Sequence, residues 1–147
     1  QVLAVLGDLR ANSKKQLLQT LSEAAAEVTE LPARQIFDTV LQREKLGSTG
    51  VGNGIAIPHA KLPGIDRIVG VFARLAEPID FDALDEQPVD LVFLLLAPEN
   101  AGADHLKALS RVARLMRDPA RVALLRANKD SKTLYHHLIS APASNAA

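Results

Sequence analysis

The sequence predicts an α/β fold, with one domain in which helices pack on both faces of a single mixed β-sheet. Segments with helical spacing alternate along the 147 residues with short segments typical of strands. Residues 89–97 form a nearly continuous apolar run, as expected for a strand that is buried on both faces. No linker rich in Pro, Gly or Ser divides the chain. We therefore expect one domain over residues 1–147, with a frayed tail from about residue 140.

Two helices are expected before the first predicted strand. Ser13 and Gln16 have the spacing of a capping box, and the apolar residues that follow keep helical spacing as far as Val28. Pro32 suits the first turn of a second helix, and Gly47 ends that helix.

A glycine-rich segment joins the second helix to a strand. Residues 48–54 carry alternating glycines and are expected to form a loop. Residues 55–57 are apolar and predict a short strand that Pro58 stops. His59 comes next and is expected at a strand end, which is where α/β sheets place their chemistry.

Two longer strands follow. Residues 68–75 are rich in branched side chains and predict one of them. Residues 77–90 predict an acidic connection, with a short strand around residues 79–81. Residues 89–97, closed by Pro98, predict the central strand.

Helices are expected over the C-terminal part of the chain. The first spans residues 103–117, and the next begins with Asp118 as its cap and Pro119 in its first turn. Asp130 or Ser131 caps the last helix. The helix over residues 103–117 is expected to turn five side chains inward: Leu106, Leu109, Val112, Ala113 and Met116.

Composition excludes several classes of function. The chain has no cysteine, which excludes a disulfide scaffold and a thiol nucleophile and fits a cytoplasmic location. Lys plus Arg equals Asp plus Glu at 17 each, so no global charge favours nucleic acid or anionic lipid. One Tyr and no Trp leave few platforms for stacking bases. The longest apolar run, residues 91–97, is far shorter than the roughly 20 residues of a membrane-spanning helix.

His59 is the strongest candidate for chemistry. It lies between a glycine-rich segment and Lys61, directly after a proline that restricts the backbone. A neutral imidazole is a good nucleophile near pH 7 and can attack phosphorus or an acyl carbon. The exposed amides of a glycine loop can stabilise a phosphoryl group on the ring. The alternative is a histidine that only caps the end of a strand.

His105 and Arg43 are weaker candidates. His105 is either a core-edge histidine, a hydrogen-bond donor to a group on His59, or half of a metal pair. The metal pair is weak because a catalytic zinc ion uses three protein ligands. Arg43 is either a solvated residue near a helix C-terminus or a clamp for phosphate oxygens.

The remaining charged residues favour solvated surfaces. His136 and His137 are adjacent and point about 100° apart on a helix, so we expect surface positions. A basic row favours a solvated face over a docking surface; it comprises Arg111, Arg114, Arg117 and Arg121. An acidic stretch is either solvated or steers a basic partner; it comprises Glu77, Asp80, Asp82, Asp85, Glu86 and Asp90.

Residues 47–61, Gly-Ser-Thr-Gly-Val-Gly-Asn-Gly-Ile-Ala-Ile-Pro-His-Ala-Lys, resemble a block of the fructose/mannitol-type enzyme IIA family of the bacterial phosphotransferase system. The resemblance is strongest to the nitrogen-regulatory enzyme IIA members of that family. It covers nearly the whole chain as far as about residue 139. The other segments that carry it are residues 13–15, 69–72, 79–84, 87–91 and 105–110.

This resemblance implies a phosphoryl-transfer site. It implies that His59 accepts a phosphoryl group from a histidine phosphocarrier protein, which is charged from phosphoenolpyruvate through enzyme I. It further implies Nε2 as the phosphorylated atom, with Nδ1 held by a backbone carbonyl. His105 then supports the phosphorylated ring, and Arg43 balances the phosphate charge. The predicted phosphoryl-pocket loop supplies Ser48, Thr49, Gly52, Asn53 and Gly54.

Three functions remain as alternatives. The first is a phosphocarrier that regulates transporters or sensor kinases according to its phosphorylation state. The second is a sugar-specific enzyme IIA that passes phosphate to enzyme IIB of a permease. The third, a small metal-dependent hydrolase that uses His59 and His105, ranks far behind. The first two need no cofactor, nucleic acid or insertion into a membrane, and the sequence leaves the oligomeric state open.

Overall fold

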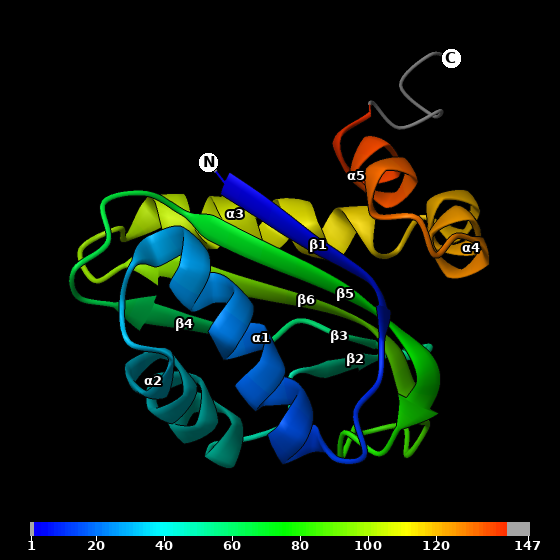
Figure 1. Cartoon of the computed structure of the whole chain (residues 1–147), viewed down its shortest axis with the longest axis horizontal. Coiled ribbons are helices and arrows are strands. Elements are labelled where there is room, and N and C mark those ends of the chain that lie inside the picture. Colours follow the sequence, from blue (N-terminus) through cyan, green and yellow to red (C-terminus); the bar gives the residue numbers. More distant parts are fainter. Residues whose placement is uncertain (1, 141–147) are drawn as a thin grey trace.

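A mixed β-sheet runs through the middle of the computed structural model (Figure 1). The structure describes residues 2–140, and within them six strands follow the spatial order β1-β5-β6-β3-β2, with β4 also paired to β6. β5 and β6 are antiparallel, whereas β1 is parallel to β5, and β3 and β4 are parallel to β6. The strands are β1 (Val2–Leu9), β2 (Gly50–Gly52), β3 (Ile55–Ala56), β4 (His59–Leu62), β5 (Val69–Ile79) and β6 (Val89–Pro98).

Helices cover both faces of this sheet, which confirms the predicted fold class. α1 and α2 pack on one face, and α3, α4 and α5 pack on the other (Figure 1). β6 contributes to both cores because its side chains alternate, so that Leu94 faces α1 and α2 while Leu95 faces α3. The helices are α1 (Lys14–Thr29), α2 (Ala33–Lys45), α3 (Ala103–Leu115), α4 (Pro119–Ala127) and α5 (Ser131–Ile139).

Side-chain caps fix the starts of three helices as the sequence predicts. Ser13 accepts a hydrogen bond from the Gln16 N–H at 3.1 Å at the start of α1. Asp118 caps α4, and Pro119 is its first residue. Asp130 is the residue that caps α5.

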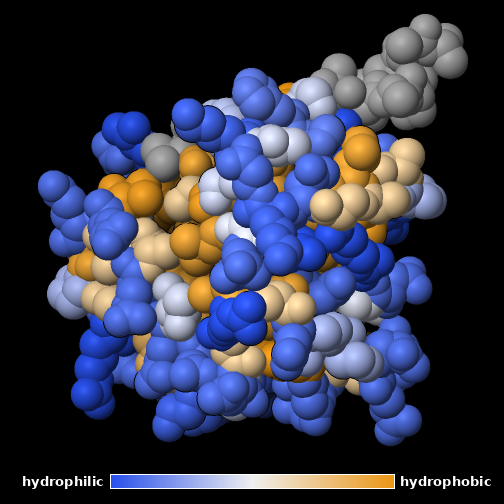
Figure 2. Space-filling model, turned by 45° about the vertical axis from the view of Figure 1, so that its right-hand side comes forward, coloured by the Kyte–Doolittle hydropathy of each residue, from blue (hydrophilic) through white to orange (hydrophobic). Residues whose placement is uncertain are grey.

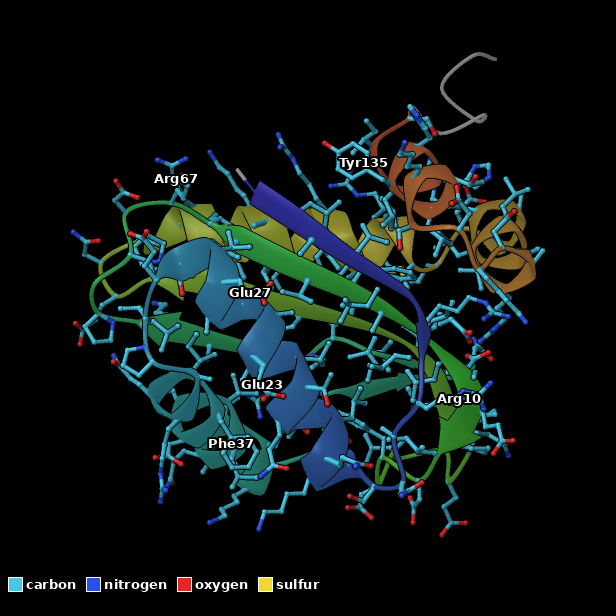
Figure 3. The ribbon with its side chains drawn as sticks, in the orientation of Figure 1. Arg10, Glu23, Glu27, Phe37, Arg67 and Tyr135 are labelled. Atoms are coloured by element: carbon cyan, nitrogen blue, oxygen red, sulfur yellow. The ribbon has the colours of Figure 1, made fainter. Side chains whose placement is uncertain are left out.

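The surface carries the polar faces of these helices. Figure 3 shows Glu23 and Glu27 on the outer side of α1, away from the sheet. The face in Figure 2 mixes hydrophilic and apolar residues. No helix within residues 2–140 combines the length and hydrophobicity that crossing a membrane requires.

The glycine-rich segment is not simply the predicted loop over residues 48–54. Its residues Gly50–Gly52 form β2, which pairs with β3 in an antiparallel hairpin. The turn consists of Asn53 and Gly54, both with positive φ, and Asn-Gly is the commonest signal for such a turn. Gly50 also packs tightly, because an added Cβ would lie 2.7 Å from the Cβ of Ala83.

Three further differences concern the ends and faces of elements. The first residues of the chain form β1, for which no prediction was made. The strand predicted over residues 68–75 continues to Ile79, so the separate strand expected around residues 79–81 does not form. Leu106 is 67% exposed rather than buried, because α3 turns Ala108 and Val112 toward the sheet instead. The tail from residue 141, predicted to be frayed, lies outside the described residues.

β3 and β4 behave as one strand that is interrupted for two residues. Ile55 pairs with Leu91 and His59 pairs with Leu95, so the register on β6 is the same on both sides of the break. Pro58 has no N–H to donate within the break, but its carbonyl accepts the Leu95 N–H at 2.9 Å. His59 therefore shares a sheet face with Leu95, the face that α3 covers.

Candidate functional site

His59 is the first residue of β4 and is half-buried. Its Nδ1 lies 2.9 Å from the carbonyl oxygen of Ile57. A carbonyl oxygen only accepts hydrogen bonds, so Nδ1 carries the proton and donates. The lone pair of the neutral ring is then on Nε2. This contact therefore leaves Nε2 as the nitrogen that is available to a reacting partner.

His105 lies beside His59, on the first turn of α3. The two ring centroids are 5.8 Å apart, and the planes are tilted by 59°. Nε2 of His105 is buried and has no hydrogen-bond partner within residues 2–140. Burial lowers the pKa of His105 from its usual 6.5, and the charges of His59 and Lys61 lower it further. A neutral imidazole with an unused polar atom therefore faces the candidate nucleophile.

Arg43 lies on the last turn of α2, at the entry to the glycine-rich segment. Its Nη1 donates to the carbonyl of Gly47 at 3.0 Å. The Ile57 N–H donates to the carbonyl of Thr49 at 3.0 Å, so the chain before β2 runs antiparallel to the segment that leads to His59. Arg43 therefore fixes the turn between α2 and the glycine-rich segment.

Ser48 and Thr49 anchor this segment to the protein. The Ser48 hydroxyl donates to the carbonyl of Phe81 at 3.0 Å and accepts the Gly50 N–H at 3.1 Å. Thr49 is buried, and its N–H and hydroxyl both donate to the carboxylate of Glu44. Both side chains therefore fix the position of the backbone that lies next to Ile57.

The tip of the hairpin lies further from His59. The Gly54 carbonyl accepts the Leu91 N–H at 3.1 Å, whereas His59 pairs with Leu95. Four residues of β6 separate the two levels, which is roughly 13 Å along a strand. The structure therefore does not bring Gly52, Asn53 and Gly54 to the level of His59.

Arg126 of α4 holds that tip. Its Nε and Nη2 donate to both carboxylate oxygens of Asp90 at 3.0 Å, and Nη2 also contacts the carbonyl of Asn53. Asp85 accepts the Asn53 N–H at 3.2 Å. The carboxylates of Asp85 and Asp90 and the guanidinium of Arg126 thus hold the turn in place.

The other charged candidates lie outside the His59 site. Arg121 was expected in a solvated row but is buried, and its Nη1 donates to the carbonyl of His137 at 2.7 Å, which joins α4 to α5. Asp90 is half-buried by its pairing with Arg126, while the rest of the acidic stretch is exposed. His136 is exposed and His137 half-buried, both on α5. Within residues 2–140, no three side chains of His, Cys, Asp or Glu are grouped to hold a metal ion.

Glu44 is a site-adjacent residue that the sequence analysis missed. It is 6% exposed, and its carboxylate is paired with Lys14 at 2.9 Å. Glu44 follows Ile36 and Val40 at intervals of four, so it falls on the buried stripe of α2. An acidic residue on an apolar stripe is the signal that could have identified it.

This arrangement is suited to nucleophilic catalysis by an imidazole. The Ile57 carbonyl selects the tautomer of His59, which is half-buried at the start of β4. His105 is adjacent to His59, and Arg43 holds the carbonyl of Gly47 at the entry to the glycine-rich segment. Such a set of groups favours an electrophile that brings negative charge, such as a phosphoryl group.

Comparison with known proteins agrees with this chemistry. Residues 2–141 match the family model described as "Phosphoenolpyruvate-dependent sugar phosphotransferase system, EIIA 2". The chain is 58% identical over 143 residues to a nitrogen regulatory protein of Bradyrhizobium diazoefficiens, covering 97% of this chain and 94% of that protein.

Solved structures share the fold. The crystal structure of nitrogen regulatory protein IIA-Ntr from Neisseria meningitidis is 35% identical, with a TM-score of 0.88, over 93% of this chain and 96% of that one. The IIA mannitol protein of Escherichia coli is 20% identical, with a TM-score of 0.75, over 91% of this chain and 94% of that one. The latter likeness shows the fold alone. The chain therefore belongs to the EIIA 2 family of the phosphoenolpyruvate-dependent sugar phosphotransferase system and is of its nitrogen regulatory type.

Proposed function

We propose that Nε2 of His59 accepts a phosphoryl group from a histidine phosphocarrier protein, and that the resulting phosphorylation state regulates partner proteins. The observation that carries this proposal is the hydrogen bond from Nδ1 of His59 to the Ile57 carbonyl at 2.9 Å. It leaves Nε2 as the only ring nitrogen with a lone pair in the neutral ring. Membership of the EIIA 2 family supports phosphoryl transfer as the reaction.

The step exchanges one nitrogen–phosphorus bond for another. The Nε2 lone pair attacks phosphorus and the bond from phosphorus to the donor's imidazole breaks. The donor ring, which carries a proton on its other nitrogen, keeps that electron pair and leaves as a neutral imidazole. The proton on Nδ1 of His59 stays in its hydrogen bond with Ile57. One imidazole gains the phosphoryl group that the other loses. The transfer therefore needs alignment of the two rings and stabilisation of the phosphoryl charge, but no resident cofactor.

His105 and Arg43 support the phosphorylated state in this proposal. His105 is 5.8 Å away between ring centroids and has an unused nitrogen that can donate to a phosphoryl oxygen. Its lowered pKa favours the neutral ring before transfer, so that His105 places no second positive charge beside the ring of His59. Arg43 adds the permanent cation that a phosphoryl dianion favours.

Regulation is the proposed output because of the type of protein that the chain resembles. Two relatives, with 58% and 35% sequence identity to the chain over the aligned residues, are named as nitrogen regulatory proteins. Attaching a phosphoryl group adds negative charge at the start of β4. That charge change alters which protein surfaces can dock there, such as those of transporters or sensor kinases.

The test is intact mass after incubation with phosphoenolpyruvate, enzyme I and a histidine phosphocarrier protein, with each component omitted in turn. One acid-labile phosphoryl group that depends on the complete set is expected, and His59→Ala is expected to abolish it. His136→Ala is the matched control, because His136 is an exposed histidine on α5, and it should gain the same mass as the wild type. A phosphorylated His59→Ala variant would show that another residue is the acceptor.

Two further readouts separate regulation from sugar transport. Affinity capture with the phosphorylated protein and with His59→Ala should retain different sets of partners if phosphorylation regulates binding. Rapid transfer from phosphorylated His59 to a cysteine of a sugar-specific enzyme IIB would instead assign a role in sugar uptake.

A further inference from the structure

A continuous set of hydrogen bonds leads from Glu44 to the ring of His59. The Glu44 carboxylate accepts the Thr49 N–H at 3.3 Å and also accepts the Thr49 hydroxyl. The Thr49 carbonyl accepts the Ile57 N–H at 3.0 Å. The Ile57 carbonyl in turn accepts Nδ1–H of His59 at 2.9 Å. Every link between Glu44 and the candidate nucleophile is therefore a direct contact.

Glu44 is held firmly enough to serve as an anchor. Its side chain is 2% exposed, and Nζ of Lys14 lies 2.9 Å from Oε1. Lys14 also lies over the ring of Phe81, with Nζ 4.4 Å from the centroid. A buried carboxylate is tolerated only where such partners compensate for lost hydration. The ion pair thus joins α1 to α2 at the start of the glycine-rich segment.

Ile57 depends on Thr49 because it lies in the break between β3 and β4. Residues on either side of the break pair with β6, but Ile57 has its N–H bonded to Thr49 instead of to a sheet neighbour. The direction of its carbonyl is set by the backbone on both sides, with Thr49 on one side and Pro58 on the other. Loss of the Thr49 anchor therefore loosens the carbonyl that selects the tautomer of His59.

We infer that Glu44 is a positioning residue for phosphoryl transfer, which acts through Thr49 to hold the Ile57 carbonyl against Nδ1 of His59. This inference rests on the proposed function for the transfer step, but the tautomer of His59 can be measured without transfer. Glu44 touches neither the nucleophilic atom nor a phosphoryl group. Glu44 acts by raising the fraction of His59 rings that have a free lone pair at Nε2.

The test compares Glu44→Gln, Thr49→Val and Thr49→Ser. Glu44→Gln removes the charge, Thr49→Val removes the hydroxyl, and Thr49→Ser keeps it. The tautomer of His59 is read from the ring nitrogen shifts by NMR in protein labelled with ¹⁵N at histidine. The rate of phosphoryl acceptance is read by intact mass at limiting phosphocarrier protein. Val40→Ala is the matched control, because Val40 is buried on the same helix, one turn before Glu44, and belongs to the hydrophobic core.

Glu44→Gln and Thr49→Val should raise the fraction of the Nε2–H tautomer and slow acceptance about tenfold, a size typical for groups that orient a reacting residue. Thr49→Ser should restore both values. Val40→Ala should lower the melting temperature and leave both values at the wild-type level. Unchanged tautomer populations in folded Glu44→Gln and Thr49→Val would overturn the inference, as would an equal loss in Val40→Ala. A wild-type protein that takes up no phosphoryl group would overturn the proposed function but leave the tautomer comparison valid.

Discussion

The rings of His59 and His105 lie 5.8 Å apart and are tilted by 59°, although 45 positions separate them in the sequence. β4 supplies one ring and the first turn of α3 supplies the other. Both side chains are half-buried, so burial does not distinguish them. Hydrogen bonding does: Nδ1 of His59 is bonded to the Ile57 carbonyl, whereas Nε2 of His105 is buried and has no partner within residues 2–140.

The acid stability of the protein should depend on His105. Its pKa is lowered in the folded state, so its stabilising contribution is complete above pH 6.5 and is lost as the pH falls through the lower folded value. Urea unfolding at a series of pH values should therefore show a smaller acid loss for His105→Gln than for the wild type. Parallel curves for the two proteins would contradict this prediction.

Phosphorylation should reverse the pKa shift of His105. A phosphoryl dianion beside the ring favours the imidazolium form, which raises the pKa. NMR titration of His105 should show a higher pKa in the phosphorylated protein than in the free protein. His137, half-buried on α5, serves as an internal reference whose ring signals should be unchanged by phosphorylation.

Replacing Arg43 should shorten the lifetime of the phosphorylated form. Arg43→Ala removes a fixed cation and the hydrogen bond to Gly47, so we expect decay of the phosphoryl group to accelerate about tenfold. Decay is followed by intact mass after the donors are removed. Arg34→Ala is the control, because it removes an exposed arginine from the first turn of the same helix. Its phosphorylated form should lose the phosphoryl group at the wild-type rate. Equal lifetimes for all three proteins would remove the clamp role.

Replacing Arg126 should separate stability from transfer. Arg126→Ala leaves Asp90 and the Asn53 carbonyl without their shared donor, so we expect a loss of about 1–3 kcal/mol in the free energy of unfolding. The hairpin tip lies away from the level of His59, so the rate of phosphoryl acceptance should change little. A large loss of that rate in folded protein would instead support the predicted role of the tip amides in the phosphoryl pocket.

Gly7→Ala should destabilise the junction between β1 and the segment before α5. An added Cβ would lie 1.9 Å from the carbonyl oxygen of Lys129, which is backbone and cannot rotate away. We expect a loss of about 1–3 kcal/mol, measured by urea unfolding. Asp8→Ala changes the exposed neighbour and should be nearly neutral. Equal stability of the two variants would show that the strand shifts freely.

The elements with strong local signals were predictable from the sequence. Helix caps such as Ser13 and Asp118 satisfy backbone N–H groups within a few residues, so their effect is visible in the sequence. The buried strand β6 was predictable because both of its faces are apolar. His59 was identified because a proline and a glycine-rich segment flank it.

The features that depend on distant partners were not predictable in the same way. β4 includes the polar residues His59 and Lys61, and only its pairing with β6 makes it a strand. Leu106 fits the apolar spacing of α3, but the helix is rotated so that this side chain faces outward. The sequence places Arg121 in a row of surface arginines. In the structure it is buried, because carbonyl groups at the end of α5 accept its hydrogen bonds.

The interrupted strand formed by β3 and β4 makes the site sensitive to the number of residues in the chain. Both halves keep one register on β6, so His59 reaches the α3 face by counting from Ile55. One residue inserted into the break would turn the imidazole toward the core beneath α1 and α2. Both residues of the break, Ile57 and Pro58, are buried, and an insertion or deletion there would change the sheet face on which the His59 ring lies. Spacing between Ile55 and His59 is thus a requirement of the site in its own right, separate from the identity of any single residue.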